Sequence, residues 1–162
     1  MTVELDIQIA TQLFGHKVEL RCGWYNPENG DFYPSAPAQN LPSGSDDWLE
    51  DRYCIVENEE IFFCDHSAKG GYPPAKITDI TKDNYHNYLI EGSELVPGYS
   101  EDIAAAFEVI EWLNKNELYW RLEVDCMGYC MTIKDDIKTI IEYGKNIPEL
   151  ICITALKYVN TL

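Results

Sequence analysis

The chain has 162 residues, of which 28 are acidic and 12 are basic, and its formal net charge at pH 7 is −16. So few lysines and arginines exclude an extended basic surface of the kind that binds DNA, RNA or an anionic membrane directly. The length favours a single domain over residues 1–162.

The acidic charge has two interpretations. It either keeps the protein soluble, or it forms an acidic face that mimics nucleic acid and docks on a basic partner. The densest acidic segments are 46–51 and 57–60. The second interpretation depends on these segments being free at the surface.

Targeting and metal signals are weak. The N-terminus carries acidic residues and no basic segment that would begin a signal peptide, so we expect a cytoplasmic protein. None of the six cysteines forms a CxxC pair, and only Cys126 with Cys130 and Cys64 with His66 have a close spacing suited to ligands. We therefore expect free thiols, no metal and no other cofactor.

The first half of the chain predicts one helix followed by short strands. Apolar residues at three- and four-residue steps indicate a helix over 2–14, with its stripe on Val3, Ile7, Ala10 and Phe14. The remaining expectations are a strand over 18–22, a turn at 26–30 between strand ends at 24–25 and 32–33, a loop over 34–47, a hairpin of 53–56 with 61–64, and a strand or short helix over 85–90.

The second half predicts a central and a closing helix. Ser100 is the expected N-cap of a helix over 101–115, with Ile103, Ala106, Phe107, Ile110 and Leu113 on its apolar face. The expectations that follow are a hairpin of 119–124 with 128–133, a short helix over 135–143, and a buried helix from Ile147. Together these elements indicate an α+β fold, an antiparallel sheet packed against helices.

Two segments carry a family resemblance. Residues 97–111, PGYSEDIAAAFEVIE, and residues 147–157, IPELICITALK, resemble the phage ABA-sandwich domain family. Phe107 stands where that family pattern has Trp. The stretch at about 23–95 does not match, so the resemblance implies an insertion of loops and hairpins there. The resemblance implies a helix–sheet–helix sandwich and a phage or prophage source, hence the cytoplasm of a bacterial host, and it implies no catalytic residues.

No catalytic motif is present. Asp65, His66 and Ser67 contain the residue types of a catalytic triad, but triads are assembled from separate segments, so a solvated loop is the better interpretation. The aromatic residues in the predicted loops are better candidates for ligand binding, because aromatic faces stack on bases. Arg21, Lys69, Lys76 and Arg121 are available as donors to phosphates.

The leading hypothesis is a non-enzymatic phage-type protein that sequesters a small nucleotide-like host immune signal without cleaving it. The alternative is an acidic protein–protein inhibitor of a basic host factor, and a homo-oligomer is compatible with both. The candidate ligand-binding residues are Arg21, Trp24, Tyr25, Tyr99, Ser100, Asp102, Trp120 and Arg121. Ser100 and Asp102 are expected to accept hydrogen bonds from a ribose or a base rather than bind phosphate, because Glu101 and Asp102 already bring negative charge to that helix start.

Overall fold

A computed structural model describes residues 2–64 and 76–161 of the chain. The chain divides into two compact units: unit 1 comprises Met1–Gly15 and Pro97–Leu162, and unit 2 comprises His16–Val96. The sequence predicts one domain with an insertion at about 23–95, and cooperative folding of the two units as one domain stays a prediction. The α+β prediction is confirmed, because helices pack against antiparallel sheet within a helix–sheet sandwich.

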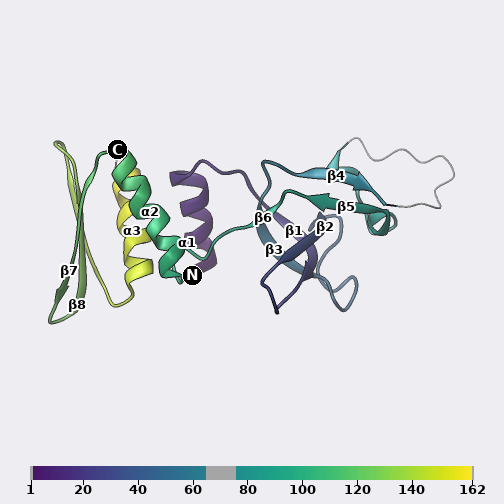
Figure 1. The fold of residues 1–162 in the computed structure, drawn as a ribbon, viewed down its shortest axis with the longest axis horizontal. Helices are drawn as coiled ribbons and strands as arrows, with labels where there is room; N and C mark the ends of the chain where they lie inside the picture. Colours follow the sequence, from purple (N-terminus) through teal and green to yellow (C-terminus); the bar gives the residue numbers. More distant parts are fainter. Residues whose placement is uncertain (1, 65–75, 162) are drawn as a thin grey trace. The chain divides into compact units, whose positions relative to one another are not determined.

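Unit 1 is built from helices and one antiparallel sheet (Figure 1). Its elements are α1 (Thr2–Gln8), the π-helical turn η1 (Ile9–Leu13), α2 (Ile103–Lys115), β7 (Tyr119–Asp125), β8 (Gly128–Lys134), β9 (Thr139–Gly144) and α3 (Ile147–Asn160). The strand order is β7-β8-β9. Helix α3 packs on β8 and β9 on one side and contacts α1 and α2 on the other, so it is the centre of this unit.

The start of α2 differs from the prediction. Asp102, not Ser100, is the N-cap, and its Oδ1 accepts a hydrogen bond of 2.8 Å from the Ala104 amide. Ser100 is buried, and its own amide donates to Asp6 Oδ1 at 2.7 Å. Both residues suit a cap chemically, and the contact with α1 determines which of them takes the role.

The apolar faces of two helices also shift. In the N-terminal segment the buried residues are Asp6, Ile9, Ala10 and Leu13, whereas Val3 is 55% exposed. In α2, Ile103 and Phe107 are exposed, and Ala105 and Val109 are buried in addition to Ala106, Ile110 and Leu113. The spacing rule is correct in both helices, but two overlapping stripes satisfy it, and tertiary packing selects one.

The predicted helix over 135–143 is wrong. Asp135 instead forms a turn, in which its Oδ1 accepts from the amides of Ile137 and Lys138 at 2.7 and 2.8 Å. The chain then continues as β9, which pairs with β8 in antiparallel register. An aspartate that bonds nearby amides favours a turn over a helix, and pairing with β8 satisfies the backbone that follows.

Unit 2 consists mainly of strands and tight turns. Its elements are β1 (Val18–Tyr25), β2 (Phe32–Pro37), β3 (Glu50–Ile55), β4 (Glu60–Phe63), the 3-10 turns η2 (Ile77–Asp79) and η3 (Tyr85–Asn87), β5 (Tyr88–Glu91) and β6 (Glu94–Leu95). One sheet has the order β2-β1-β3-β6, and β4 pairs with β5. Its core comprises Cys22, Ala36, Ala38, Leu41, Leu49, Ile80, Tyr85 and Ile90.

Three features of unit 2 correct or refine the prediction. The turn at 26–30 does join β1 to β2, but β2 extends to Pro37, into the predicted loop, as an edge strand that tolerates proline. The hairpin of 53–56 with 61–64 is wrong, because β3 pairs with β1 and β6 while β4 pairs with β5. Segment 85–90 contains both predicted alternatives, a helical turn and then a strand.

Gly23 lies where two backbones approach closely. A Cβ atom at this position would be only 2.2 Å from the carbonyl oxygen of Tyr33 on the neighbouring strand β2. The register of β1 with β2 shifts between Cys22 and Gly23, which marks a bulge. A residue without a side chain is therefore required for β1 to follow β2 through this bulge.

Membrane insertion through a helix has no candidate in the described part of the chain. None of its helices combines the length and the apolar composition that crossing a bilayer requires.

The buried carboxylate of Asp6 makes a testable prediction. Burial raises the pKa of Asp6 above its ordinary value of 3.8, and the hydrogen bonds from Ser100 offset this only in part. The folded state then binds a proton more readily than the unfolded chain, so the contribution of Asp6 to stability falls as the pH rises above 3.8. Asp6→Asn retains an acceptor for Ser100 and removes this loss, so we expect a free energy of unfolding at pH 7 at least equal to that of the wild type.

The measurement is chemical denaturation at pH 5 and pH 7. Asp6→Ala is the matched variant, because it leaves the buried Ser100 amide without its acceptor, at a cost of about 1–3 kcal/mol. Equal destabilisation by the Asn and Ala variants would contradict this account of the carboxylate.

Candidate functional site

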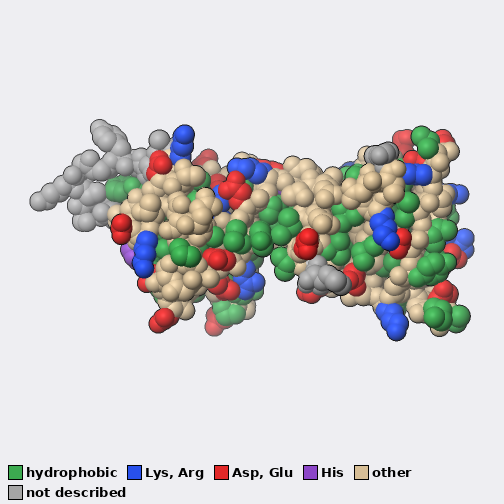
Figure 2. Space-filling model, turned by 180° about the vertical axis from the view of Figure 1, so that it is seen from behind, with side chains coloured by type: hydrophobic (Ala, Val, Ile, Leu, Met, Phe, Trp, Pro, Cys, Tyr) green, Lys and Arg blue, Asp and Glu red, His purple; other side chains and the backbone are tan. Residues whose placement is uncertain are grey.

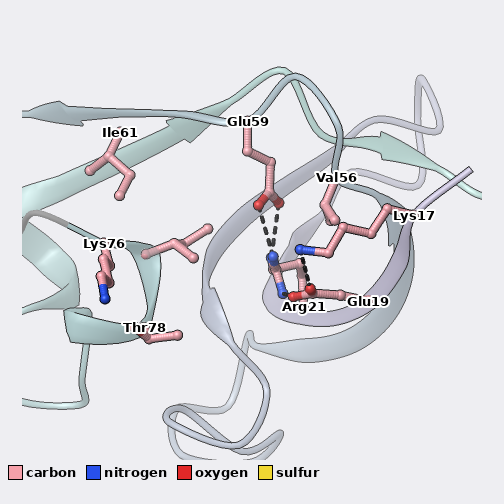
Figure 3. Close-up of a pocket in the computed structure, with 9 residues that line it drawn as sticks. Lys17, Glu19, Arg21, Val56, Glu59, Ile61, Lys76 and Thr78 are labelled. Carbon is pink, nitrogen blue, oxygen red and sulfur yellow. Dashed lines mark hydrogen bonds and ion pairs between the residues drawn. The ribbon is translucent and has the colours of Figure 1, made fainter.

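Unit 2 contains a pocket of about 540 Å³ (Figure 3). Its lining comes from β1 and the segment before it, the region between β3 and β4, β4 itself, and η2. The lining residues are Lys17, Glu19, Arg21, Val56, Glu59, Ile61, Lys76, Ile77 and Thr78. Three basic residues therefore face one hollow in a strongly acidic chain.

The alternation of a strand brings three of these side chains together. Glu19 and Arg21 are two residues apart on β1, and Lys17 precedes the strand at the same spacing, so all three lie on one face. Val18 and Leu20 alternate with them, and Leu20 packs against the core of unit 2. This local pattern makes the opposite face of the strand the charged wall of the pocket.

Arg21 is the floor of the pocket, with only 2% of its side chain exposed. Its Nε and Nη2 donate to the two carboxylate oxygens of Glu59, each at 2.8 Å, and its Nη1 donates to Glu19 Oε2 at 2.8 Å. Glu59 also accepts a hydrogen bond of 2.6 Å from the Ser93 hydroxyl. A bidentate pair of this kind is among the strongest side-chain contacts in proteins.

The charges of this cluster support one another. Burial by itself would lower the pKa of Arg21, but the hydrogen bonds and charges of Glu59 and Glu19 outweigh burial and leave that pKa raised. The pKa of Glu19 is lowered, mainly by its hydrogen bond with Lys17 and further by Arg21. Arg21 and Glu19 are therefore both charged at neutral pH.

The rim of the pocket is more accessible than its floor. The Lys17 side chain is 67% exposed, and its Nζ lies 2.6 Å from Glu19 Oε1. Lys76 lies on the other side of the opening (Figure 3), and within the described residues no carboxylate forms an ion pair with it. Val56, Ile61 and Ile77 add an apolar part to the wall.

The candidate residues of unit 2 divide between different surroundings. Arg21 lines the pocket, but its donors are engaged by Glu59 and Glu19. Trp24 is 43% exposed and stacks on Tyr33 with ring centroids 5.3 Å apart, whereas Tyr25 lies under the Arg52 guanidinium at 4.4 Å. Trp24 and Tyr25 are consecutive on β1, so they point to opposite faces of the sheet and neither lines the pocket.

Tyr99, Ser100 and Asp102 of unit 1 lie at the start of α2. Tyr99 and Ser100 are each 1% exposed, and Asp102 is occupied as the helix cap. Burial raises the pKa of the Tyr99 phenol, with further contributions from Glu108 and Asp6. These surroundings give each residue a role in the architecture of unit 1.

Trp120 and Arg121 are consecutive on β7 and therefore point to opposite faces of its sheet. The Trp120 indole donates to Asn114 Oδ1 at 2.9 Å. Arg121 is 60% exposed, and its Nη2 lies 2.5 Å from Glu123 Oε1. A ligand on one face of this sheet thus meets one of the two residues and not the other.

Several carboxylates of the two acidic segments have surroundings inside unit 2 that limit their exposure. In 46–51, Asp46 accepts from the Tyr85 hydroxyl, Glu50 pairs with Arg52, and Asp51 has one buried carboxylate oxygen. In 57–60, Glu57 accepts from the Lys17 amide and Glu59 holds Arg21. Asp47, Glu57 and Glu60 are nevertheless exposed, so an acidic face at these segments stays a prediction.

Two thiols of unit 2, those of Cys22 and Cys54, are buried. Burial is the main cause that raises the pKa of Cys22 and of Cys54 to about 12, so both thiols are protonated at neutral pH. Asp65, His66, Ser67 and Lys69 lie outside the described residues. Within the described part, no group of three or more His, Cys, Asp or Glu side chains gathers as metal ligands do.

Sequence reasoning missed Lys17 and the role of Glu19. The signal was present as the run Lys17-Val18-Glu19-Leu20-Arg21, in which every second residue is charged on an otherwise apolar strand. The sequence pattern indicates Glu59 only as one member of the acidic segment 57–60. Its contact with Arg21 spans 38 positions and has no local pattern.

The chain was compared with known proteins. No family model and no curated protein sequence matches it. Among solved structures it is similar to a phage protein from Bacillus cereus ATCC 14579, with 13% identity and a TM-score of 0.49, over 96% of this chain and 89% of that one.

The buried ion pair makes the second prediction. Glu59→Ala removes the main counter-charge of a guanidinium that is 2% exposed. We expect the free energy of unfolding to fall by about 3–5 kcal/mol, because an uncompensated buried charge is costly. Chemical denaturation followed by tryptophan fluorescence measures this change.

Glu60→Ala is the matched control, since Glu60 is the next residue and is exposed. Its effect should stay within about 0.5 kcal/mol. Glu59→Gln keeps an acceptor for Arg21 and should fall between the two, so the series remains informative if the Ala variant does not fold. Equal stability of the variants at positions 59 and 60 would refute the structural role of the pair.

Proposed function

We propose that this protein is a small phage-type binding protein that sequesters a nucleotide-like anionic ligand in the pocket of unit 2 without cleaving it. The observation that carries the proposal is the gathering of Lys17, Arg21 and Lys76 around one pocket. These are three of only 12 basic residues in a chain with a net charge of −16. Basic side chains are scarce in such a chain, so a pocket that gathers three of them offers favourable charge to a phosphate group.

The three basic residues have different roles in this proposal. Arg21 is already neutralised by Glu59 and Glu19, so it shapes the floor rather than contacting the ligand. Lys17 pairs with Glu19 in an exposed contact, which is worth about 0–1 kcal/mol, so a phosphate can take the place of Glu19 at little cost. Lys76 is the second cation offered to the ligand.

The remainder of the pocket suits the uncharged part of such a ligand. Val56, Ile61 and Ile77 provide apolar contact for a base or sugar, and the Thr78 hydroxyl adds a polar group. No aromatic side chain is among the described lining residues, so base stacking is not the mode of binding that we propose.

Binding without cleavage is favoured by the state of the polar groups. The described lining includes no histidine or cysteine, and Glu19 and Glu59 are both held in ion pairs with Arg21. A carboxylate held in this way is a poor general base. The phage assignment comes from the ABA-sandwich resemblance at 97–111 and 147–157 and is part of the proposal.

The third prediction tests ligand capture. The protein is incubated with mononucleotides, linear dinucleotides and cyclic nucleotides, filtered, and the filtrate quantified by chromatography. We expect one class to be depleted in proportion to the protein and to be recovered intact after denaturation. Altered products would identify an enzyme, and no depletion at micromolar protein would refute the proposal.

Single substitutions of lysines test whether the ligand binds in this pocket. Lys17→Ala and Lys76→Ala should each weaken binding by about tenfold, since each removes a cation that meets the phosphate. Lys82→Ala is the matched control, because Lys82 is an exposed lysine of the same unit that does not line the pocket. Equal depletion by all three variants would exclude this pocket as the site.

A further inference from the structure

Among the described residues of unit 1, no element packs on one face of its sheet. Met131 and Ile133 of β8 are buried on the side where α3 packs. Since side chains alternate along a strand, Cys130, Thr132 and Lys134 point to the opposite side. Figure 1 shows the helices of unit 1 on only one side of this sheet.

The register of the three strands defines the residues of this outer face. Directly opposite residues share a face, and the resulting rows are Tyr119–Lys134–Thr139, Arg121–Thr132–Ile141 and Glu123–Cys130–Tyr143. The Lys134 ammonium lies 4.6 Å from the centroid of the Tyr119 ring, which agrees with both side chains lying on the same face of the sheet.

The outer face exposes an unusual share of apolar surface. Tyr119, Ile141 and Tyr143 are 49%, 50% and 66% exposed. Figure 2 shows unit 1 with its sheet seen from the edge, and hydrophobic side chains lie between acidic and basic ones on the visible surface. Large exposed side chains clustered on one face indicate an interaction surface.

The charges of the outer face are ordered along the strands. Arg121 and Lys134 lie in the two rows at one end, and Glu123 lies in the row at the other end, followed by Asp125. The face therefore has a cationic end at Lys134 and an anionic end at Asp125, and Arg121 and Glu123 between them form an exposed ion pair of 2.5 Å within the chain.

We propose that the outer face binds the same face of a second copy of this chain. A two-fold axis in the plane of the sheets and perpendicular to the strands reverses strand direction and preserves strand order. Arg121 then lies opposite the partner subunit's Glu123, and Ile141 lies opposite the partner subunit's Tyr143, with each contact made twice. Such an arrangement is the isologous contact of two-fold dimers.

Charge complementarity selects a second copy over other occupants. A strongly basic partner would meet Arg121 and Lys134, and an acidic one would meet Glu123 and Asp125. A partner with the same order of charges, turned by the two-fold axis, satisfies both ends together. The same rotation brings Ile141 opposite the partner subunit's Tyr143, so apolar residues also meet apolar residues.

The dimensions of the face set the expected strength. Three strands of about seven residues cover roughly 15 by 20 Å, less than the about 800 Å² per partner of a standard stable interface. We therefore expect a reversible dimer with a dissociation constant in the micromolar range, about 1–100 µM.

The experiment is sedimentation velocity of the full chain from about 1 to about 500 µM, with native mass spectrometry. The wild type should shift from monomer to dimer over this range. Arg121→Glu and Glu123→Arg should each raise the dissociation constant at least about tenfold, because each brings like charges together across the axis. A wild type that stays monomeric throughout would overturn the proposal.

An equimolar mixture of two variants distinguishes the loss of dimer contacts from misfolding. R121E has only acidic groups at these two positions and E123R only basic ones, so an equimolar mixture should form the heterodimer that neither variant forms alone. The double variant R121E/E123R should again self-associate. Absence of both the heterodimer and this recovery would overturn the proposal.

Lys115→Glu is the matched control for net charge. Lys115 is an exposed residue of α2 and is not on the outer face, yet its substitution changes the charge as R121E does. It should self-associate like the wild type. Dissociation equal to that of R121E would attribute the effect to total charge and overturn the proposed pairing.

Discussion

The buried guanidinium of Arg21 is the constraint on which the arrangement of unit 2 depends. Removing such a group from water costs several kcal/mol unless its donors and charge are satisfied. The donors and the charge of Arg21 are satisfied by Glu19 on the same strand and by Glu59. Glu59 in turn accepts a hydrogen bond from Ser93, which lies between β5 and β6. One buried charge therefore ties β1 to the approaches of β4 and β6, and the pocket is the space left above that contact.

The high negative charge of the chain is not equivalent to an acidic surface. Several carboxylates have structural partners: Asp6 accepts from Ser100, Asp102 caps α2, Asp135 forms a turn and accepts from Tyr158, and Glu59 pairs with Arg21. Asp6, Asp102 and Asp135 accept hydrogen bonds from uncharged amides or a hydroxyl. These contacts therefore do not reduce the net negative charge of the chain. Charge counting alone thus overestimates how much of the acid is free to meet a partner.

Local patterns predicted the type of most elements and failed where a distant partner decides. Helices α2 and α3 and the hairpin of β7 with β8 follow from periodicity and turn residues nearby in sequence. Segment 139–144 carries both helical and strand features, and only the edge offered by β8 makes it a strand. The failed hairpin of 53–56 with 61–64 has the same cause, since both strands are good β-formers but pair with other strands.

The sequence by itself determined the α+β class, the acidic character and the alternation that puts Lys17, Glu19 and Arg21 on one face, because these depend on composition and on neighbours within a few residues. Only the tertiary structure decided that Arg21 is a buried structural cation and that Asp102 rather than Ser100 caps α2. Each of these outcomes depends on burial and on contacts between residues far apart in the chain, such as Ser100 with Asp6, and no local pattern encodes such contacts.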